Sequence, residues 1–271
     1  MYEEYWGFSE KPFENTPDPK FLYCSAQHEE ALMRMLYASR EQKGAVLLTG
    51  EVGSGKTLLS RVLIGKLNEE SSKYSVSLVV NPAIPSLDLL KEIVYQLGCD
   101  VSKDDSKLDV LHKLNDVLYR NLVEDRHSII IIDEAQAIND ETTFEEMRLI
   151  LNFHSNERFP LTLLLLGQPE LKEKIKNIRQ LEQRFSLRYH LQNLNFEETT
   201  GYIKHRCRVA QREGDVFTDT SCRLIYEFTD GIPRKINNIC DLSLLIGFGK
   251  KADAVDESIT QAVIEDMRQQ S

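Results

Sequence analysis

The residues with the clearest chemical signature are glycines, a lysine and a threonine at fixed spacing in the run Gly50-Glu51-Val52-Gly53-Ser54-Gly55-Lys56-Thr57. The run fits G-x-x-x-x-G-K-[ST] and lies between a short apolar run and a helical pattern, which is the context that this motif requires. Its glycines let the backbone wrap so that N–H groups and a helix N-terminus face a phosphate. Lys56 can then reach the β- and γ-phosphates, and the Thr57 hydroxyl can coordinate Mg²⁺.

This pattern predicts a site for ATP or ADP with Mg²⁺. A glycine-rich turn that carries a lysine by chance is the competing interpretation, and the flanking elements argue against it. The nucleotide-binding residues that we expect in and after the loop are Glu51, Val52, Gly53, Ser54, Gly55, Lys56, Thr57 and Leu58.

An acidic pair, Asp133-Glu134, follows the short β-branched run 128–132. Such a run is typical of a strand covered on both faces, and ligands of open α/β sheets collect at the carboxyl ends of strands. We expect Asp133 to hold Mg²⁺, directly or through water. Glu134 points elsewhere and is the candidate general base for an attacking water. The alternative is that both acids only begin a solvated loop.

Apolar runs and helical periodicities alternate along the first two thirds of the chain. Strands are predicted at 45–49, 74–80, 128–132, 161–166 and near residue 189. Helices are predicted at 25–42, from the glycine loop to about 68, at 86–97, at 108–124 and from Pro169 onward. This alternation predicts an α/β fold with a five-stranded parallel sheet and helices on both faces.

Only helical patterns follow residue 193, and they define the predicted domain division. The helices are expected at 196–212, 219–229, 234–248 and 257–269, the last capped by Asp256. We therefore expect an ATPase core over 1–192, including an aromatic and proline-rich N-terminal segment. A smaller all-helical lid domain over 193–271 follows it.

Composition narrows the classes of partner. The net charge of −10 gives no general attraction to nucleic acid or anionic lipid. Five scattered cysteines without a C-x-x-C pair argue against a disulfide framework or a zinc site. The N-terminus lacks the pattern of a signal peptide, and no apolar run approaches the roughly 20 residues that a membrane span needs. We expect a cytoplasmic chain without a membrane span, with peripheral attachment to the inner membrane left open.

The sequence resembles the AAA+ superfamily, in which an extra strand lies between the phosphate-loop strand and the Asp-Glu strand. The resemblance implies that 161–167 is this strand and that Gln168 is a polar sensor touching the γ-phosphate or the lytic water. Asn81 matches a position at which an amide restrains the catalytic glutamate. The competing interpretations are a loop glutamine before Pro169 and a turn before Pro82.

Two arginines acquire roles from the same resemblance. The segment 181–185 resembles an arginine-finger box, which makes Arg184 the first candidate for a finger and Arg188 the second. A finger acts on a neighbouring subunit, so the resemblance implies a homo-oligomer. The run 231–234 resembles a second sensor motif, in which Arg234 would contact the γ-phosphate and couple it to lid closure. Surface salt bridges and a simple helix start are the alternatives.

A closer resemblance, to the general secretion pathway component A (ExeA-like) ATPases, covers nearly the whole chain. The runs that carry it are Trp6-Gly7-Phe8, Pro12-Phe13, Thr16-Pro17-Asp18-Pro19, Phe21-Leu22-Tyr23, His28-Glu29-Glu30-Ala31-Leu32, Gly50-Glu51-Val52-Gly53, Asp133-Glu134-Ala135-Gln136, Gly167-Gln168-Pro169-Glu170-Leu171, Arg188-Tyr189-His190-Leu191 and Gly231-Ile232-Pro233-Arg234. We expect the N-terminal aromatic segment to cover the adenine, with His28 nearby. Core packing of Phe13, Phe21 and Tyr23 is an equal alternative. Secretion members of this family often continue into a membrane span and a peptidoglycan-binding module, and we expect neither within this sequence.

Two functions of different classes follow. The favoured one is an oligomerising ATPase that assembles or remodels a bacterial envelope machine, such as a type II secretion, pilus or exopolysaccharide export system. The alternative is an ATP-dependent DNA-binding regulator of transposition target selection. The basic residues that keep it open are Lys172, Lys174, Lys176, Arg179, Arg184, Arg188, Lys204, Arg206, Arg208 and Arg212. A third possibility is a superfamily 2 helicase, since Asp133-Glu134-Ala135-Gln136 resembles that family's D-E-A-x box. Room for only one nucleotide-binding core argues against a two-core helicase.

Overall fold

The computed structural model of the chain describes residues 1–70, 72–153 and 159–269. The chain forms two compact units. We call residues 29–50 and 59–191 the sheet unit, and residues 1–28, 51–58 and 192–271 the helical unit. The predicted division at residue 192 differs from this grouping in two respects: the N-terminal segment 1–28 and the phosphate loop 51–58, both expected with the core, group with the C-terminal helices.

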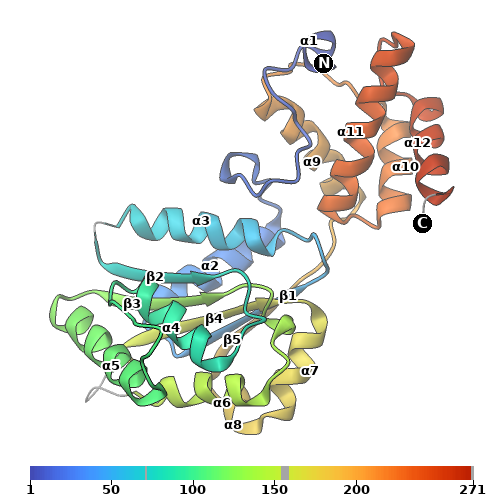
Figure 1. Cartoon of the computed structure of the whole chain (residues 1–271). Coiled ribbons are helices and arrows are strands. Elements are labelled where there is room, and N and C mark those ends of the chain that lie inside the picture. The colour runs from blue at the N-terminus through green and yellow to red at the C-terminus, as the bar shows by residue number, and fades with distance from the viewer. Residues whose placement is uncertain (71, 154–158, 270–271) are drawn as a thin grey trace. The chain divides into compact units, whose positions relative to one another are not determined.

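The sheet unit is built on five parallel strands (Figure 1). They are β1 (Ala45–Gly50), β2 (Tyr74–Val79), β3 (His127–Ile132), β4 (Leu161–Gly167) and β5 (Phe185–Leu191). Their order is β2-β3-β4-β1-β5, which confirms the predicted insertion of β4 between the loop strand and the acid strand. In the register, Leu165 lies beside both Leu47 and Ile132. The carboxyl ends of β1, β4 and β3 therefore meet at one edge of the sheet.

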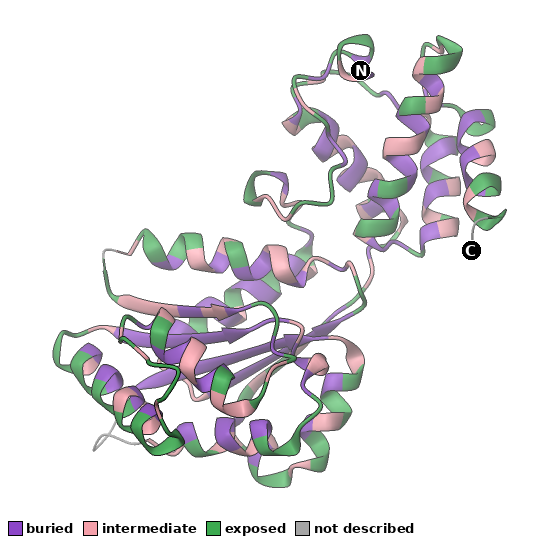
Figure 2. Ribbon diagram, viewed as in Figure 1, coloured by how far each residue is buried: buried purple, intermediate pink, exposed green. Residues whose placement is uncertain are grey.

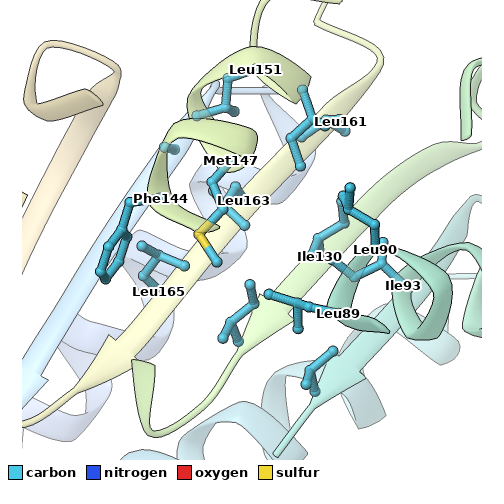
Figure 3. Close-up of a cluster of buried hydrophobic side chains, with 14 of the residues drawn as sticks. Leu89, Leu90, Ile93, Ile130, Phe144, Met147, Leu151, Leu161, Leu163 and Leu165 are labelled. Atoms are coloured by element: carbon cyan, nitrogen blue, oxygen red, sulfur yellow. The ribbon is translucent and has the colours of Figure 1, made fainter. Parts of the chain in front are cut away.

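The central strands are buried along their whole length (Figure 2). Because successive side chains of a strand point to opposite faces, both faces of these strands are covered. One face packs against five helices: α4 (Ser86–Gln96), α5 (Lys107–Val123), α6 (Glu141–Ile150), α7 (Pro169–Asn177) and α8 (Arg179–Glu182). Figure 3 shows this packing, with Met147 against Leu163 of β4 and Leu90 beside Ile130 of β3. Helices α2 (Ala26–Arg40) and α3 (Lys56–Asn68) cover the other face. This is why the central strands read as unbroken apolar runs.

The helical unit contains α9 (Phe196–Val209), α10 (Asp219–Thr229), α11 (Pro233–Lys250) and α12 (Glu257–Gln269). The N-terminal segment, with α1 (Glu3–Trp6) and the 3₁₀ turn η1 (Pro19–Phe21), supplies Trp6, Phe8 and Phe13 to its core. Trp6 also donates its indole N–H to the Leu244 carbonyl over 2.9 Å. Aromatic rings find apolar cover and a hydrogen-bond acceptor here, which explains why the segment joins the helices.

A buried arginine fastens the N-terminal segment to α9. The Arg206 guanidinium donates to the carbonyls of Pro12 and Glu14 and to the Tyr202 hydroxyl, and it stacks on the Phe21 ring at 4.6 Å. A buried cation must be hydrogen-bonded, and these contacts within the helical unit satisfy the Arg206 guanidinium.

Local details differ from the predictions at several helix ends. Helix α4 begins at Ser86, as predicted, but its N-cap residue is Pro85, which supplies no side-chain cap. The predicted Asp256 cap of α12 is confirmed, since its carboxylate accepts from the Ile259 N–H over 3.0 Å. Helices α6 and α8 were not predicted from the sequence. Within the described residues, no helix combines the length and apolarity needed to cross a bilayer.

A buried histidine on β3 generates a pH prediction. His127 lies 2.8 Å from the Thr162 hydroxyl through Nε2, and burial lowers its pKa from 6.5 to about 4. Below pH 6.5 His127 binds a proton in the unfolded chain but stays neutral in the folded chain. The free energy of unfolding therefore decreases as the pH falls. Between pH 7.5 and 5 we expect it to fall by about 2 kcal/mol more than in His127→Gln.

Urea unfolding of both proteins at the two pH values measures this difference. Equal losses in the parent and in His127→Gln would contradict the assignment.

Candidate active site

The phosphate loop adopts a closed backbone conformation within the helical unit. Gly53 and Gly55 have φ angles of 82° and 103°, which favour glycine. A Cβ on Gly53 would lie 2.5 Å from the Arg234 Cβ, so the close approach also requires a glycine. The Lys56 ammonium, at the first residue of α3, donates to the Glu51 carbonyl over 2.8 Å. The lysine thus reaches back across the loop that precedes it.

The donors of this loop fit a phosphate. The first N–H groups of a helix lack intrahelical partners, and here α3 begins at Lys56 directly after the glycines. The Ser54 hydroxyl is buried and has no hydrogen-bond partner within the described part of the chain. A buried donor of this kind is costly unless a ligand satisfies it. The loop therefore has the shape and the donors for a phosphate group.

His28 braces the loop from α2. Its Nε2 lies 3.1 Å from the Ser54 carbonyl, and its Nδ1 lies 2.7 Å from the Ser25 hydroxyl. Because a carbonyl only accepts, Nε2 carries the proton and Nδ1 accepts from Ser25. Burial lowers the pKa of His28, which keeps the ring neutral. The predicted place of His28 near the adenine stays a prediction, and its contacts are with the loop backbone.

The rings expected over the adenine have other contacts. Phe13 packs edge-on against Phe217 at 5.7 Å, and Tyr23 against Tyr202 at 6.0 Å. Phe21 lies under Arg206. These contacts correspond to the core-packing alternative.

Arg234 lies at the loop. Its N–H donates to the Gly53 carbonyl over 3.2 Å, at the start of α11. The preceding turn needs Gly231, whose φ is 69° and whose added Cβ would lie 1.8 Å from the Leu194 carbonyl oxygen. The predicted second sensor therefore begins beside the phosphate loop, and its exposed side chain has room to turn.

The acidic pair follows β3 at the carboxyl edge of the sheet. Asp133 is buried, and its N–H donates to the Val79 carbonyl over 2.9 Å. Glu134 has a left-handed backbone, with φ 51° and ψ 35°. Its N–H donates to the Asp133 carboxylate over 2.9 Å, while its own carboxylate accepts from the Gln136 amide over 2.5 Å. The two carboxylates thus have different neighbours.

The candidate sensor follows the adjacent strand. Gln168 comes directly after β4 and is the N-cap residue of α7, and its N–H donates to the Gln136 side chain over 3.0 Å. Gly167 lies beside Thr49 of β1 in the register. Gly50, where the phosphate loop begins, therefore emerges at the same edge as Gln168 and Asp133. Asn81 lies exposed beyond β2, and its restraining role stays a prediction.

Comparison with known proteins identifies the family. Residues 39–175, more than half of the chain, match the model described as an AAA domain. The chain belongs to the AAA family of ATPases. It is also 36% identical over 252 residues to General secretion pathway protein A of Aeromonas hydrophila, covering 92% of this chain and 45% of that protein. The chain thus spans less than half the length of this curated relative.

Solved structures share the fold of this AAA chain. The Aeropyrum pernix ORC2 protein, in ADPNP and ADP complexes, has a TM-score of 0.66 and 20% identity over 87% of this chain and 66% of its own. Drosophila ORC bound to DNA has a TM-score of 0.74 and 14% identity over 96% of this chain and 65% of its own. At these identities the likeness concerns the fold alone.

The finger candidates of the AAA chain lie on the sheet unit, away from the carboxyl edge. Arg184 precedes β5 and donates to the Asn152 side chain. Arg188, within β5, pairs with the Glu182 carboxylate over 2.9 Å. A seven-residue strand is roughly 23 Å long, so Arg184 starts about one strand length from the edge where Gly50 emerges.

Sequence reasoning missed the contacts of two side chains. The sequence pattern predicted no role for Gln136 beyond the Asp-Glu-Ala-Gln run, although an amide two residues after the candidate base is a signal for a contact with that base. The role of His28 as a brace had no sequence signal, because it depends on a contact between residues 26 positions apart.

The brace leads to a prediction about affinity. His28→Leu should weaken ATP binding by roughly 10-fold, because it leaves the Ser54 carbonyl unsatisfied and loosens the loop. His28→Gln can place an amide N–H where Nε2 lies, and it should retain most of the affinity.

Calorimetric titration with a non-hydrolysable ATP analogue gives both dissociation constants. Equal weakening by the two substitutions would mean that the hydrogen bond to Ser54 is not what His28 contributes.

Proposed function

We propose that this AAA chain binds Mg-ATP and hydrolyses it to ADP and phosphate in an oligomer. The observation that carries the proposal is the phosphate loop, closed by two left-handed glycines and crossed by Lys56. A loop of this shape at a helix N-terminus suits a polyphosphate and few other ligands.

Each residue of the site has a task in this proposal. The loop N–H groups and the Ser54 hydroxyl hold phosphate oxygens, and Lys56 exchanges the Glu51 carbonyl for the β- and γ-phosphates. Thr57 and Asp133 would hold Mg²⁺, whose charge offsets that of the phosphates. Both supply the hard oxygen ligands that this ion prefers.

Hydrolysis follows from the carboxylate at the edge of the sheet. Glu134 takes a proton from water while the water oxygen forms a bond to the γ-phosphorus. The bond from that phosphorus to the bridging oxygen breaks, and ADP and phosphate leave. Gln168 orients the water or the γ-phosphate, and Arg234 stabilises the charge that develops on the γ-phosphate oxygens.

The proposed oligomer explains the place of the arginines. Arg184 lies toward the amino end of the sheet, whereas Gly50 and Asp133 lie at the carboxyl edge. That position suits a contact with the γ-phosphate of a neighbouring subunit rather than with its own. Arg188 is the second candidate, and its ion pair with Glu182 would have to break first.

We infer from the relative's name a role for the ATPase in secretion-related machinery. General secretion pathway protein A of Aeromonas hydrophila aligns over 92% of this chain. The finer proposal is nucleotide-driven assembly or remodelling of an envelope machine such as a type II secretion, pilus or exopolysaccharide system. Such work places the chain in the cytoplasm, with peripheral attachment to the inner membrane.

The DNA-binding alternative loses support from the contacts of its basic residues. Lys174 donates to two backbone carbonyls, Lys204 pairs with Asp215, and Arg206 is buried. These charges are engaged within the chain and add little to a phosphate-binding surface. ATP-dependent DNA binding that weakens steeply with salt would restore the alternative.

The proposal assigns Lys56 to ATP binding and Glu134 to hydrolysis, so substitutions of the two residues should have different effects. Lys56→Ala should weaken ATP binding by roughly 100-fold, because the phosphates lose their closest cation. Glu134→Gln should bind ATP like the parent while its kcat falls by about 10²- to 10⁴-fold. Phosphate release and analogue titration measure the two effects. Parent-like turnover by Glu134→Gln would remove Glu134 as the base.

The finger assignment is tested by mixing subunits. Arg184→Ala should keep its ATP affinity and lose kcat by about 10³-fold, since the finger acts only on the transition state. Mixing it with Glu134→Gln should restore part of the activity, because Arg184 of one variant then completes the Glu134 site of the other. Arg188→Ala tests the second candidate in the same way, and a loss of kcat in that variant alone would make Arg188 the finger. Absence of recovery in the mixture would contradict a shared interface.

A further inference from the structure

One glutamine side chain joins the proposed base to the sensor strand. The Gln136 amide nitrogen donates to the Glu134 carboxylate over 2.5 Å, and its carbonyl oxygen accepts from the Gln168 N–H over 3.0 Å. Gln136 lies in the 3₁₀ turn η2 (Ala135–Ala137), directly after the acidic pair. Both ends of the amide are thus engaged, one by the carboxylate and one by the first residue after β4.

The chemistry of the two partners fixes the orientation of this amide. A backbone N–H can only donate and a carboxylate can only accept. A flipped amide would place its NH₂ against the Gln168 N–H and its oxygen against the Glu134 carboxylate. Both contacts would then be repulsive, so the observed orientation is the stable one.

The surroundings hold the glutamine in place. A Cβ on Gly167 would lie 2.7 Å from the Gln136 amide oxygen, so the contact depends on a glycine at the end of β4. The Lys174 ammonium of α7 donates to the Gln136 carbonyl over 2.6 Å and to the Ile138 carbonyl over 2.8 Å. Backbone and side chain of Gln136 are therefore both tied to the segment that carries Gln168.

We propose that Gln136 is the positioning residue for Glu134 and couples it to the sensor strand. The inference rests on the proposed ATPase function and deepens it. The side-chain amide of Gln136 orients the Glu134 carboxylate toward the attacking water. Because the same amide is held by the Gln168 backbone, a shift of Gln168 upon contact with the γ-phosphate moves the base with it.

The most informative variant removes the hydrogen bond from Gln136 to Glu134 and keeps the one that Gln136 accepts from the Gln168 N–H. Gln136→Glu is nearly isosteric and keeps an acceptor for the Gln168 N–H, but it replaces the donor to Glu134 with a like charge. We expect kcat to fall by about 10- to 100-fold, the range for losing a hydrogen bond to a charged group. The KM for ATP should remain within about twofold, because Gln136 has no part in the phosphate loop.

The pH profile gives a readout that a purely structural role would not produce. At low pH the introduced carboxyl is protonated and can again donate to Glu134. The deficit of Gln136→Glu relative to the parent should therefore shrink as the pH falls from 8 to 6. A deficit that is the same at every pH, or a parent-like kcat throughout, overturns the proposal.

A matched control makes the same chemical change elsewhere. Gln261 of α12 also donates its amide to a glutamate, Glu265, over 2.9 Å, on an exposed helix face. Gln261→Glu should leave kcat and its pH profile unchanged. If it lowers kcat as Gln136→Glu does, the effect comes from net charge or stability and the proposal falls.

The two levels of the proposal fail in different ways. Glu134→Gln, assayed in parallel on the full chain, reports on the proposed function. If that variant turns over like the parent, Glu134 is not the base and the proposed function fails. If it is inactive while Gln136→Glu is fully active at every pH, only the positioning role of Gln136 is overturned.

Discussion

The chemistry of this chain depends on parallel pairing of β1, β4 and β3 in one register. Parallel pairing brings the ends of these strands to one edge, where Gly50 ends β1 and Gln168 and Asp133 directly follow β4 and β3. Thr49 and Gly167, 118 positions apart in the chain, thereby become neighbours at the level of the backbone. The burial of the three strands on both faces stabilises this register, because a one-residue slip would exchange the side chains of the two faces.

Much of this frame could be predicted from the sequence. Runs such as 129–132 are apolar because both faces of the strand are covered, and such runs predict the strands directly. The loop 50–57 could also be predicted, since the spacing of its glycines and lysine follows from the backbone geometry around a phosphate. The edge strand β5 was predicted only near Tyr189, because its alternating exposure leaves a weaker pattern.

What escaped prediction depends on contacts between distant segments. The aromatic residues of the N-terminal segment were expected with the core, yet Trp6 and Phe13 pack among the C-terminal helices. An apolar pattern predicts that a side chain will be buried, but it does not predict which element of the chain it will pack against. The same limit applies to Gln136, whose two partners flank different strands and whose place requires the bare backbone of Gly167.

The left-handed backbone at Glu134 has an evolutionary consequence. A glutamate held at φ 51° costs on the order of 1 kcal/mol or more, a strain that glycine or asparagine would relieve. Selection of this protein for thermal resistance alone would favour those replacements at position 134 and discard the carboxylate. The chain thus retains there a residue that its own folding disfavours, and a laboratory screen for hardier variants needs turnover as a second criterion.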